Sequence, residues 1–166
     1  TVVNNTGVIE AKSLKNVNGT IVLDGGDQGV VRVGGSIDAS GDEAGQTGGS
    51  IKVVGANTQV LAGTSLKASG TLAGGSIETS GTTLQIASGV NVDTSSTQGT
   101  AGEWLLDPMN ITIADLATKG IDTSTSGTYT SSAESSILSV DTLNAALSNG
   151  SNVTIETNNK EAWNSA

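Results

Sequence analysis

The sequence predicts an all-β protein, a right-handed parallel β-helix with three strands in each coil. Three observations carry this prediction. Short strand-like runs recur in threes with a period of about 28 residues, which is typical of a solenoid. The 23 glycines suit many tight turns, and the single proline leaves the strand ladders almost uninterrupted. Aromatic residues make up only 2% of the chain, which fits a narrow core of stacked aliphatic side chains.

The repeated unit is clearest between Gly48 and Ala73. It holds three strand-like runs, and the triplet recurs before and after it, which predicts coils at 20–49, 50–75 and 76–103. Apolar anchors mark the same place in successive coils. In the first run they are Ile21, Ile51, Ile77 and Leu105. In the third run they are Ile9, Ile37, Leu66, Val92 and Ile121.

Alternation along the third run predicts which of its side chains point inward, because successive residues of a strand face opposite sides. The inward pairs are Ile37 with Ala39, Leu66 with Ala68, and Val92 with Thr94. The residues between them form an outward column of Glu10, Asp38, Lys67, Asp93 and Asp122. Three serines are also expected to point outward into solvent: Ser40, Ser69 and Ser95. The longest turns, 41–47 and 95–102, both follow the third run, so we expect the loops to gather along one edge.

The sequence divides into three regions: coils at 1–113, an irregular or partial coil rich in Ser and Thr at 114–138, and a short helix, a strand and a tail at 139–166. Residues 1–6 are polar and we expect them to be frayed. Residues 7–12 match the third run, so the chain enters partway through a coil.

The end of the repeats adds several further expectations. Residues 102–113 supply a fourth pair of first-run and second-run strands, and 120–124 a further third-run strand. A helix is predicted at 140–147, with Leu143, Ala146 and Leu147 on one face. Ser139 or Asp141 caps its start, Asn149-Gly150 ends it, and residues 151–157 alternate as a strand.

Composition excludes several function classes. The net charge is −9, and with only 7 basic residues the chain lacks the basic stripe that nucleic acid requires. No apolar stretch is long enough to span a membrane. The chain has neither Cys nor His, which excludes thiolate zinc sites and Ser-His catalytic triads.

Two acidic patterns are candidate sites. Asp38 and Asp93 would lie two strand spacings apart, about 10 Å, which is near the upper end for an inverting glycosidase. Lys67 lies between them, so a column of alternating charge is the favoured interpretation. Two Gly-rich turns offer carboxylates to calcium, but solvated turn residues are favoured. These are Asp24 with Asp27, and Asp42 with Glu43. We therefore predict no catalytic, cofactor or metal site.

Five Asn-x-Ser/Thr sequons are candidate glycosylation sites, although a chain rich in Asn, Ser and Thr produces such triplets by chance. They begin at Asn4, Asn18, Asn110, Asn149 and Asn152.

Four segments together resemble a known family. They are residues 31–40, the Gly-Gly-Ser-Ile repeats, Gly-Glu-Trp-Leu-Leu-Asp-Pro at 102–108 leading into Asn-Ile-Thr-Ile at 110–113, and 142–147 followed by 152–155. They resemble the filamentous-haemagglutinin-like exoproteins of Gram-negative bacteria, over about residues 19–157. That resemblance implies an interior piece of a large β-helical adhesin exported by two-partner secretion.

The resemblance implies a structural segment of a secreted, surface-displayed virulence protein that supports attachment to host cells. The expected partners are a host-cell receptor or glycan, bound through the parent protein, and an outer-membrane transporter during secretion. No catalytic residues come with the resemblance, and we do not expect an enzyme. Two alternatives remain: a lectin-like module that binds glycan itself, and a β-helical polysaccharide-processing enzyme.

Overall fold

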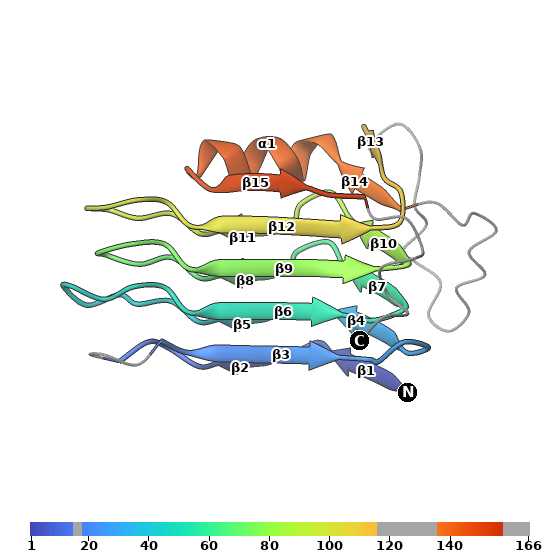
Figure 1. Ribbon diagram of the computed structural model, residues 1–166, viewed down its shortest axis with the longest axis horizontal. Coiled ribbons are helices and arrows are strands. Elements are labelled where there is room, and N and C mark those ends of the chain that lie inside the picture. Colours follow the sequence, from blue (N-terminus) through green and yellow to red (C-terminus); the bar gives the residue numbers. More distant parts are fainter. Residues whose placement is uncertain (15–17, 116–135, 158–166) are drawn as a thin grey trace.

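A computed structural model describes residues 1–14, 18–115 and 136–157. Its strands are parallel and form a β-solenoid of about four turns, with one short helix near the C-terminus (Figure 1). The predicted fold class is therefore confirmed. The strands form three sheets, which we call the first, second and third faces.

The three sheets contain the following strands. The first face is built of β3 (Thr20–Asp24), β6 (Ser50–Val54), β9 (Ser76–Gly81), β12 (Glu103–Pro108) and β15 (Asn152–Ile155). The second face is built of β1 (Val2–Asn5), β4 (Val30–Val33), β7 (Asn57–Val60), β10 (Thr83–Ile86), β14 (Ile137–Ser139) and β13 (Thr112–Ala114). The third face is built of β2 (Val8–Glu10), β5 (Ser36–Asp38), β8 (Ser65–Lys67) and β11 (Asn91–Asp93).

The core is a stack of aliphatic side chains inside these sheets. Ile21, Ile51 and Ile77 lie in register on successive first-face strands and are buried. The predicted inward residues of the third face are also confirmed as buried: Ile37, Ala39, Leu66, Ala68, Val92 and Thr94. Burial of one such large aliphatic side chain contributes about 1.5–3 kcal/mol.

The fourth anchor of the first face is Trp104, and the prediction of Leu105 was wrong by one residue. Trp104 pairs with Ile77 and is fully buried, and its indole Nε1 donates a hydrogen bond to Thr79 Oγ1 at 3.0 Å. Leu105 pairs with the outward Glu78. Because residues 104, 105 and 106 are all apolar, the sequence there did not distinguish inward from outward positions. The hydrogen bond removes the cost of burying the indole N–H.

The N-terminal residues are ordered, contrary to the prediction that 1–6 are frayed. Val2–Asn5 form β1, which pairs with β4. Asn5 Nδ2 donates a hydrogen bond to Gly34 O at 3.0 Å, so a side chain also ties this strand to the next coil. The match of residues 7–12 to the third run is confirmed, because β2 pairs with β5.

The second face ends differently from the prediction. We expected residues 110–113 to stack on β10, but β14 pairs with β10 and β13 pairs with the far side of β14. A strand from a later part of the chain therefore takes the predicted place. The predicted strand at 120–124, with Ile121 and Asp122, lies outside the described residues.

The predicted helix is confirmed as α1 (Val140–Ser148), and the strand after it as β15. Ser139 is its N-cap but makes no side-chain capping bond, and Asn149 is its C-cap. The predicted face is confirmed in part: Ala146 is buried and Leu143 packs against the core, but Leu147 is 52% exposed. Thr142 is buried in its place. Thr142 Oγ1 donates a hydrogen bond to Ala87 O at 2.7 Å, which turns that residue toward the solenoid. Packed on β11, α1 lies where a further third-face strand would stand.

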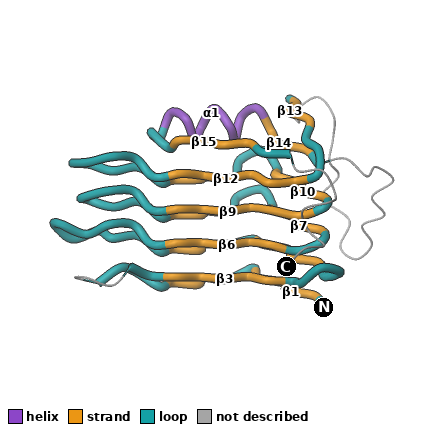
Figure 2. The backbone as a smooth tube through the Cα atoms, viewed as in Figure 1, coloured by secondary structure: helices purple, strands orange, loops and turns teal. Residues whose placement is uncertain are grey.

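Each long loop leaves the third face and returns to the first through a narrow base, so the loops gather along one edge as predicted (Figure 2). A hydrogen bond of 2.7 Å closes each base. The donors and acceptors are Gly49 N to Ala39 O, Gly75 N to Ala68 O, and Gly102 N to Thr94 O. A Cβ on Gly75 would lie 2.0 Å from the Gly49 carbonyl oxygen of the preceding coil. The Gly-Gly-Ser-Ile repeats therefore reflect backbone packing between coils.

Replacing Ile77 with Asp tests the core. We expect Ile77→Asp to lower the free energy of unfolding by about 3–5 kcal/mol, because it buries an uncompensated charge. The matched control is Leu105→Lys, which places a charge on the next strand but beside Glu78, and should change stability by less than about 0.5 kcal/mol. Urea denaturation followed by circular dichroism measures both. Similar losses in the two variants would contradict the register.

Replacing Gly75 with Ala tests the loop bases. The added methyl group meets backbone atoms that cannot rotate away, so we expect a loss of about 1–3 kcal/mol. Gly7→Ala is the control, because the nearest atom to a Cβ there is Asn5 Oδ1 at 4.0 Å. Thermal melts of both variants give the comparison. A Gly75→Ala protein as stable as the wild type would show that the coils are packed less closely than described.

Candidate functional site

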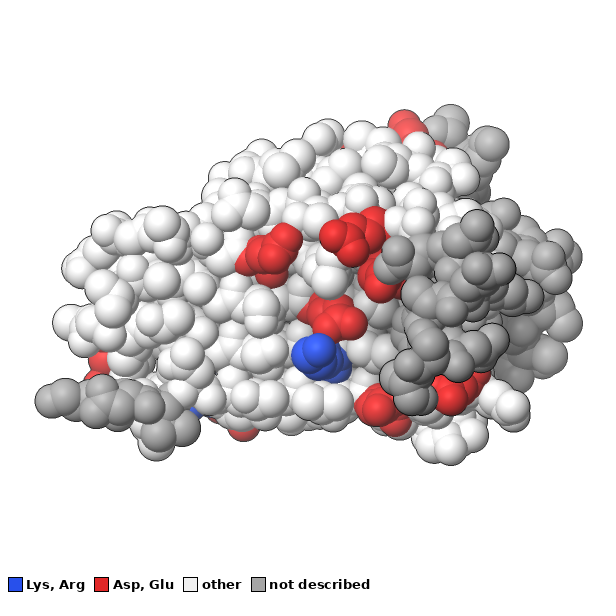
Figure 3. All heavy atoms as spheres, in the orientation of Figure 1, with Lys and Arg blue, Asp and Glu red and all other residues white. Residues whose placement is uncertain are grey.

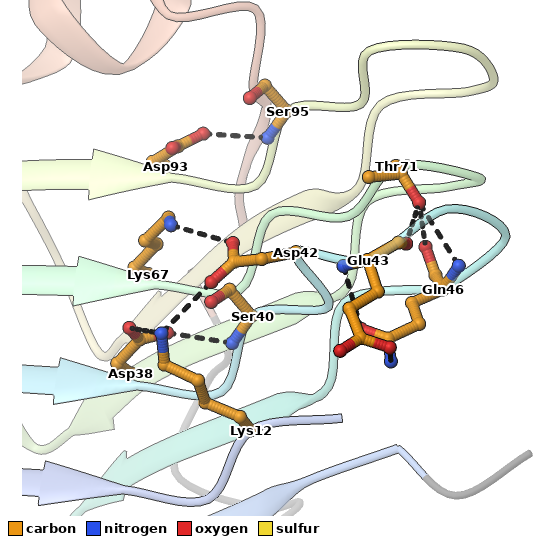
Figure 4. A network of polar contacts seen from close by, with 10 residues as sticks. All are labelled: Lys12, Asp38, Ser40, Asp42, Glu43, Gln46, Lys67, Thr71, Asp93 and Ser95. Atoms are coloured by element: carbon orange, nitrogen blue, oxygen red, sulfur yellow. Dashed lines mark hydrogen bonds and ion pairs between the residues drawn. The ribbon is translucent and has the colours of Figure 1, made fainter. Parts of the chain in front are cut away.

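The densest group of charged side chains lies where the third face meets loop 41–47 (Figure 4). Asp42, in that loop, lies between lysines from two other coils. Its Oδ2 is 2.9 Å from Lys12 Nζ, and its Oδ1 is 3.0 Å from Lys67 Nζ. Lys12 Nζ also lies 3.4 Å from Asp38 Oδ2. One loop carboxylate thus joins three successive coils.

The outward column on the third face is confirmed for Glu10, Asp38, Lys67 and Asp93, which share one register. Its charges are used differently from the prediction. Lys67 stands between two aspartates in the column, but its ion pair is with Asp42. Periodicity could not find this partner, because it lies in a loop rather than on a strand.

The two column aspartates also fix the turns that follow their strands. Asp38 Oδ1 accepts a hydrogen bond from Ser40 N at 2.8 Å, and Asp93 Oδ1 accepts one from Ser95 N at 2.9 Å. Such bonds from a short acidic side chain to the backbone two residues on are typical of Asx turns. Asp38 and Asp93, the candidate glycosidase pair, therefore have local structural partners.

The electrostatics keep the aspartates of this cluster ionised. The hydrogen bond from Lys12, followed by that from Lys67, lowers the pKa of Asp42 to about 2. Burial raises the pKa of Asp38, but the Ser40 N–H and the charge of Lys12 outweigh it, so the pKa is lowered. The pKa of Lys12 is raised, chiefly by its hydrogen bond to Asp42. A catalytic acid needs the opposite shift, a carboxyl group held neutral near pH 7.

The second half of loop 41–47 is tied to the loop above it. Glu43 N donates to Gln46 Oε1 at 3.0 Å, Gln46 N donates to Thr71 Oγ1 at 3.1 Å, and Thr71 Oγ1 donates to Glu43 O at 2.5 Å.

In the other acidic turn, Asp24 Oδ1 accepts from Gly26 N at 2.7 Å. Within the described ranges, no three Asp or Glu residues are grouped as ligands for a metal ion.

The predicted solvated serines are not all solvated. Ser40 is fully buried, whereas Ser69 and Ser95 are half-buried. The backbone ladder continues past the strands into the loop bases, with Gly41 bridged to Gly70. Ser40 therefore still lies inside the stack of coils, although it follows the last residue of β5.

A shallow groove runs along the foot of the loops, and it is lined by small residues without charged or aromatic groups. The lining residues are Asn18, Gly19, Thr20, Thr47, Gly48, Gly49, Ser50, Gly74, Gly75 and Ser76. Ser76 Oγ donates to Ser50 Oγ at 3.1 Å. Such a lining offers few groups that could orient a ligand.

The sequons differ in their surroundings. Asn149 Nδ2 donates to Asn91 Oδ1 at 3.0 Å, and the Ser151 hydroxyl of the same sequon accepts from Thr94 N at 2.9 Å. That sequon ties the end of α1 to β11. Asn4 and Asn18 are exposed.

The three faces differ in their outward charge. On the first face, seen in Figure 3, acidic groups surround a basic one, and Lys52 Nζ lies 2.8 Å from Glu78 Oε2. On the second face an outward row contains Arg32, Gln59 and Gln85. This row was not predicted from the sequence. The signal was present, because the polar member of each second run recurs with the period of the coils.

Comparison with known proteins leaves the family open, since no family model, curated protein or solved structure matches the chain. The resemblance to filamentous-haemagglutinin-like exoproteins stays a prediction from the sequence. Across the described residues, no helix combines the length and apolarity needed to cross a membrane.

The ion pairs of Asp42 predict a dependence of stability on pH. Its folded pKa lies below the ordinary value of 3.8, so its contribution is present above pH 3.8 and is lost as pH falls toward about 2. Since the side chain is 48% exposed, we expect Asp42→Asn to cost less than about 1 kcal/mol at pH 7. Urea unfolding at pH 7 and pH 2 should show this difference shrinking in acid. Asp27→Asn, on an exposed turn, should have no effect at either pH.

Proposed function

We propose that this chain is a structural segment of a secreted bacterial surface adhesin, in which it spaces or supports the part that attaches to host cells or surfaces. The main observation behind this proposal is that the coils stack through three parallel sheets, and that a hydrogen bond closes the base of each long loop. The parent protein would bind the receptor or glycan, and an outer-membrane transporter would export it. The sequence resemblance supports the same family.

A solenoid suits the role of a spacer. Each coil contacts only its neighbours, so the length of the rod grows with the number of coils while its cross-section stays constant. Side chains on the third face also support a structural role. Lys12 and Lys67 form ion pairs across coils with Asp38 and Asp42, so the charges of these four residues balance within the rod.

Removal of one whole coil tests the proposal. The correct deletion is 76–102, because Glu103 pairs with Ser76 and takes its place when Gly75 is joined to it. Our predicted coil boundary at 103 would instead join Gly75 to Trp104. That deletion moves every inward side chain of β12 to the outside. It differs by one residue from the correct deletion and should misfold, so it is the matched control.

The shortened protein needs one compensating change. After deletion of 76–102, Trp104 lies over Ile51, and Val53 stands where Thr79 accepted the indole hydrogen bond. An unpaired buried N–H costs about 1–3 kcal/mol. Val53→Thr in the deletion protein supplies a hydroxyl at that place and should recover part of this stability.

We expect a parent adhesin carrying this shortened coil stack to be exported and to attach to cells as the wild type does. Its rod should be shorter by about 4.8 Å, one strand spacing. The measurements are surface display, protease resistance and attachment to cultured cells. Loss of attachment by a variant that is folded and displayed would contradict the role of a spacer.

The second candidate function is glycan binding by the chain itself. The observation that favours it is the outward row on the second face, whose polar groups have no partners among the described residues. This row differs from the charged rows of the first and third faces, where each lysine forms an ion pair.

A further inference from the structure

The outward row on the second face is built by the register of three strands. Arg32 on β4 pairs with Gln59 on β7, which pairs with Gln85 on β10. The residues before and after each of them are buried, so these three side chains point out of the sheet. One guanidinium and two amides thus follow one another along the axis of the solenoid.

Arg32 differs from the other basic residues that the structure describes. Lys12, Lys52 and Lys67 each form an ion pair. The Arg32 side chain forms no ion pair or hydrogen bond with any residue in the described ranges, and its Nε is buried without a partner. Arg32 is therefore a basic group whose charge no carboxylate of the described residues neutralises.

The second face is also the face without acid. Its six strands contain no Asp or Glu, and Arg32 is their one charged residue and the one arginine of the chain. The first and third faces carry carboxylates on their strands, such as Glu78 and Asp93. In a chain with a net charge of −9, this face is therefore the one that favours an anion.

We propose that this row binds an oligosaccharide of carboxylated sugars, laid along the solenoid axis. Arg32 donates two parallel N–H bonds to a sugar carboxylate, and the amides of Gln59 and Gln85 bond the hydroxyl groups of the following sugars. Strands lie about 4.8 Å apart, close to the length of one sugar residue in an extended chain. This inference rests on the second candidate function and adds the ligand class.

The test is an NMR titration of the full ¹⁵N-labelled chain with oligogalacturonate, which has one carboxylate per sugar. The paired probe is the same oligosaccharide with its carboxylates methyl-esterified. We expect shifts of the amide signals of residues 32, 59 and 85 with the acid, and binding at least about tenfold weaker with the ester. Chemical-shift mapping suits weak binding, which a flat face without aromatic platforms implies.

Matched variants assign the binding to Arg32. Arg32→Gln should weaken binding of oligogalacturonate at least about tenfold, because it removes a charged hydrogen-bond pair. Arg32→Lys should bind at an intermediate level, since it keeps the charge without the two-pronged donor. Lys52→Gln removes the same charge from the first face and should leave binding unchanged. Thermal melts confirm that each variant is folded.

Two outcomes would overturn the inference in distinguishable ways. Equal binding of the ester, or undiminished binding by Arg32→Gln, would keep glycan binding but reject recognition of the carboxylate. Absence of shifts with both oligosaccharides, or shifts confined to another face, would reject the row as a site. The role of a spacer would stand in either case, because that role requires no binding of glycan by this row.

Discussion

The close approach of successive backbones is the constraint on which the structure depends. Parallel strands hydrogen-bond only when they lie about 4.8 Å apart, so each coil must follow the path of the coil before it. Side chains at equivalent positions are thereby stacked, which places Ile51 over Ile21 in the core and arranges outward residues in rows. The same close approach requires glycine at positions 75 and 102, because a carbonyl oxygen of the neighbouring coil occupies the space that a side chain would need.

The repeat made the coils and the third face predictable, because inward positions there are apolar or small and outward ones polar. Where that contrast failed, the prediction failed. Residues 104–106 are all apolar, so their sequence does not show which of them point inward. The buried indole of Trp104, hydrogen-bonded to Thr79, shows that residues 104 and 106 do. Residues 1–6 look polar, yet they are ordered because β1 pairs with β4. The side chains of the sequence give little indication of such backbone pairing.

Features made by contacts between distant segments were beyond the sequence pattern. The partner of Lys67 is Asp42, whose position depends on the path of a loop. The strand next to β10 is β14, which comes from much later in the chain. The buried side of α1 includes the predicted Ala146 but also Thr142, whose hydrogen bond to Ala87 O depends on the solenoid beneath it. Periodicity describes a repeat, whereas these contacts occur once.

The direction of the ladders has a mechanical consequence. Strands lie across the solenoid, so the hydrogen bonds between coils run in the direction in which the coils are stacked (Figure 1). Tension on the two ends therefore opens one coil interface at a time, rather than shearing a whole sheet at once. Each opened coil releases a length of chain far greater than one strand spacing, because an extended residue spans about 3.3 Å. A solenoid pulled along its axis therefore lengthens coil by coil, at a force set by the rupture of one coil interface.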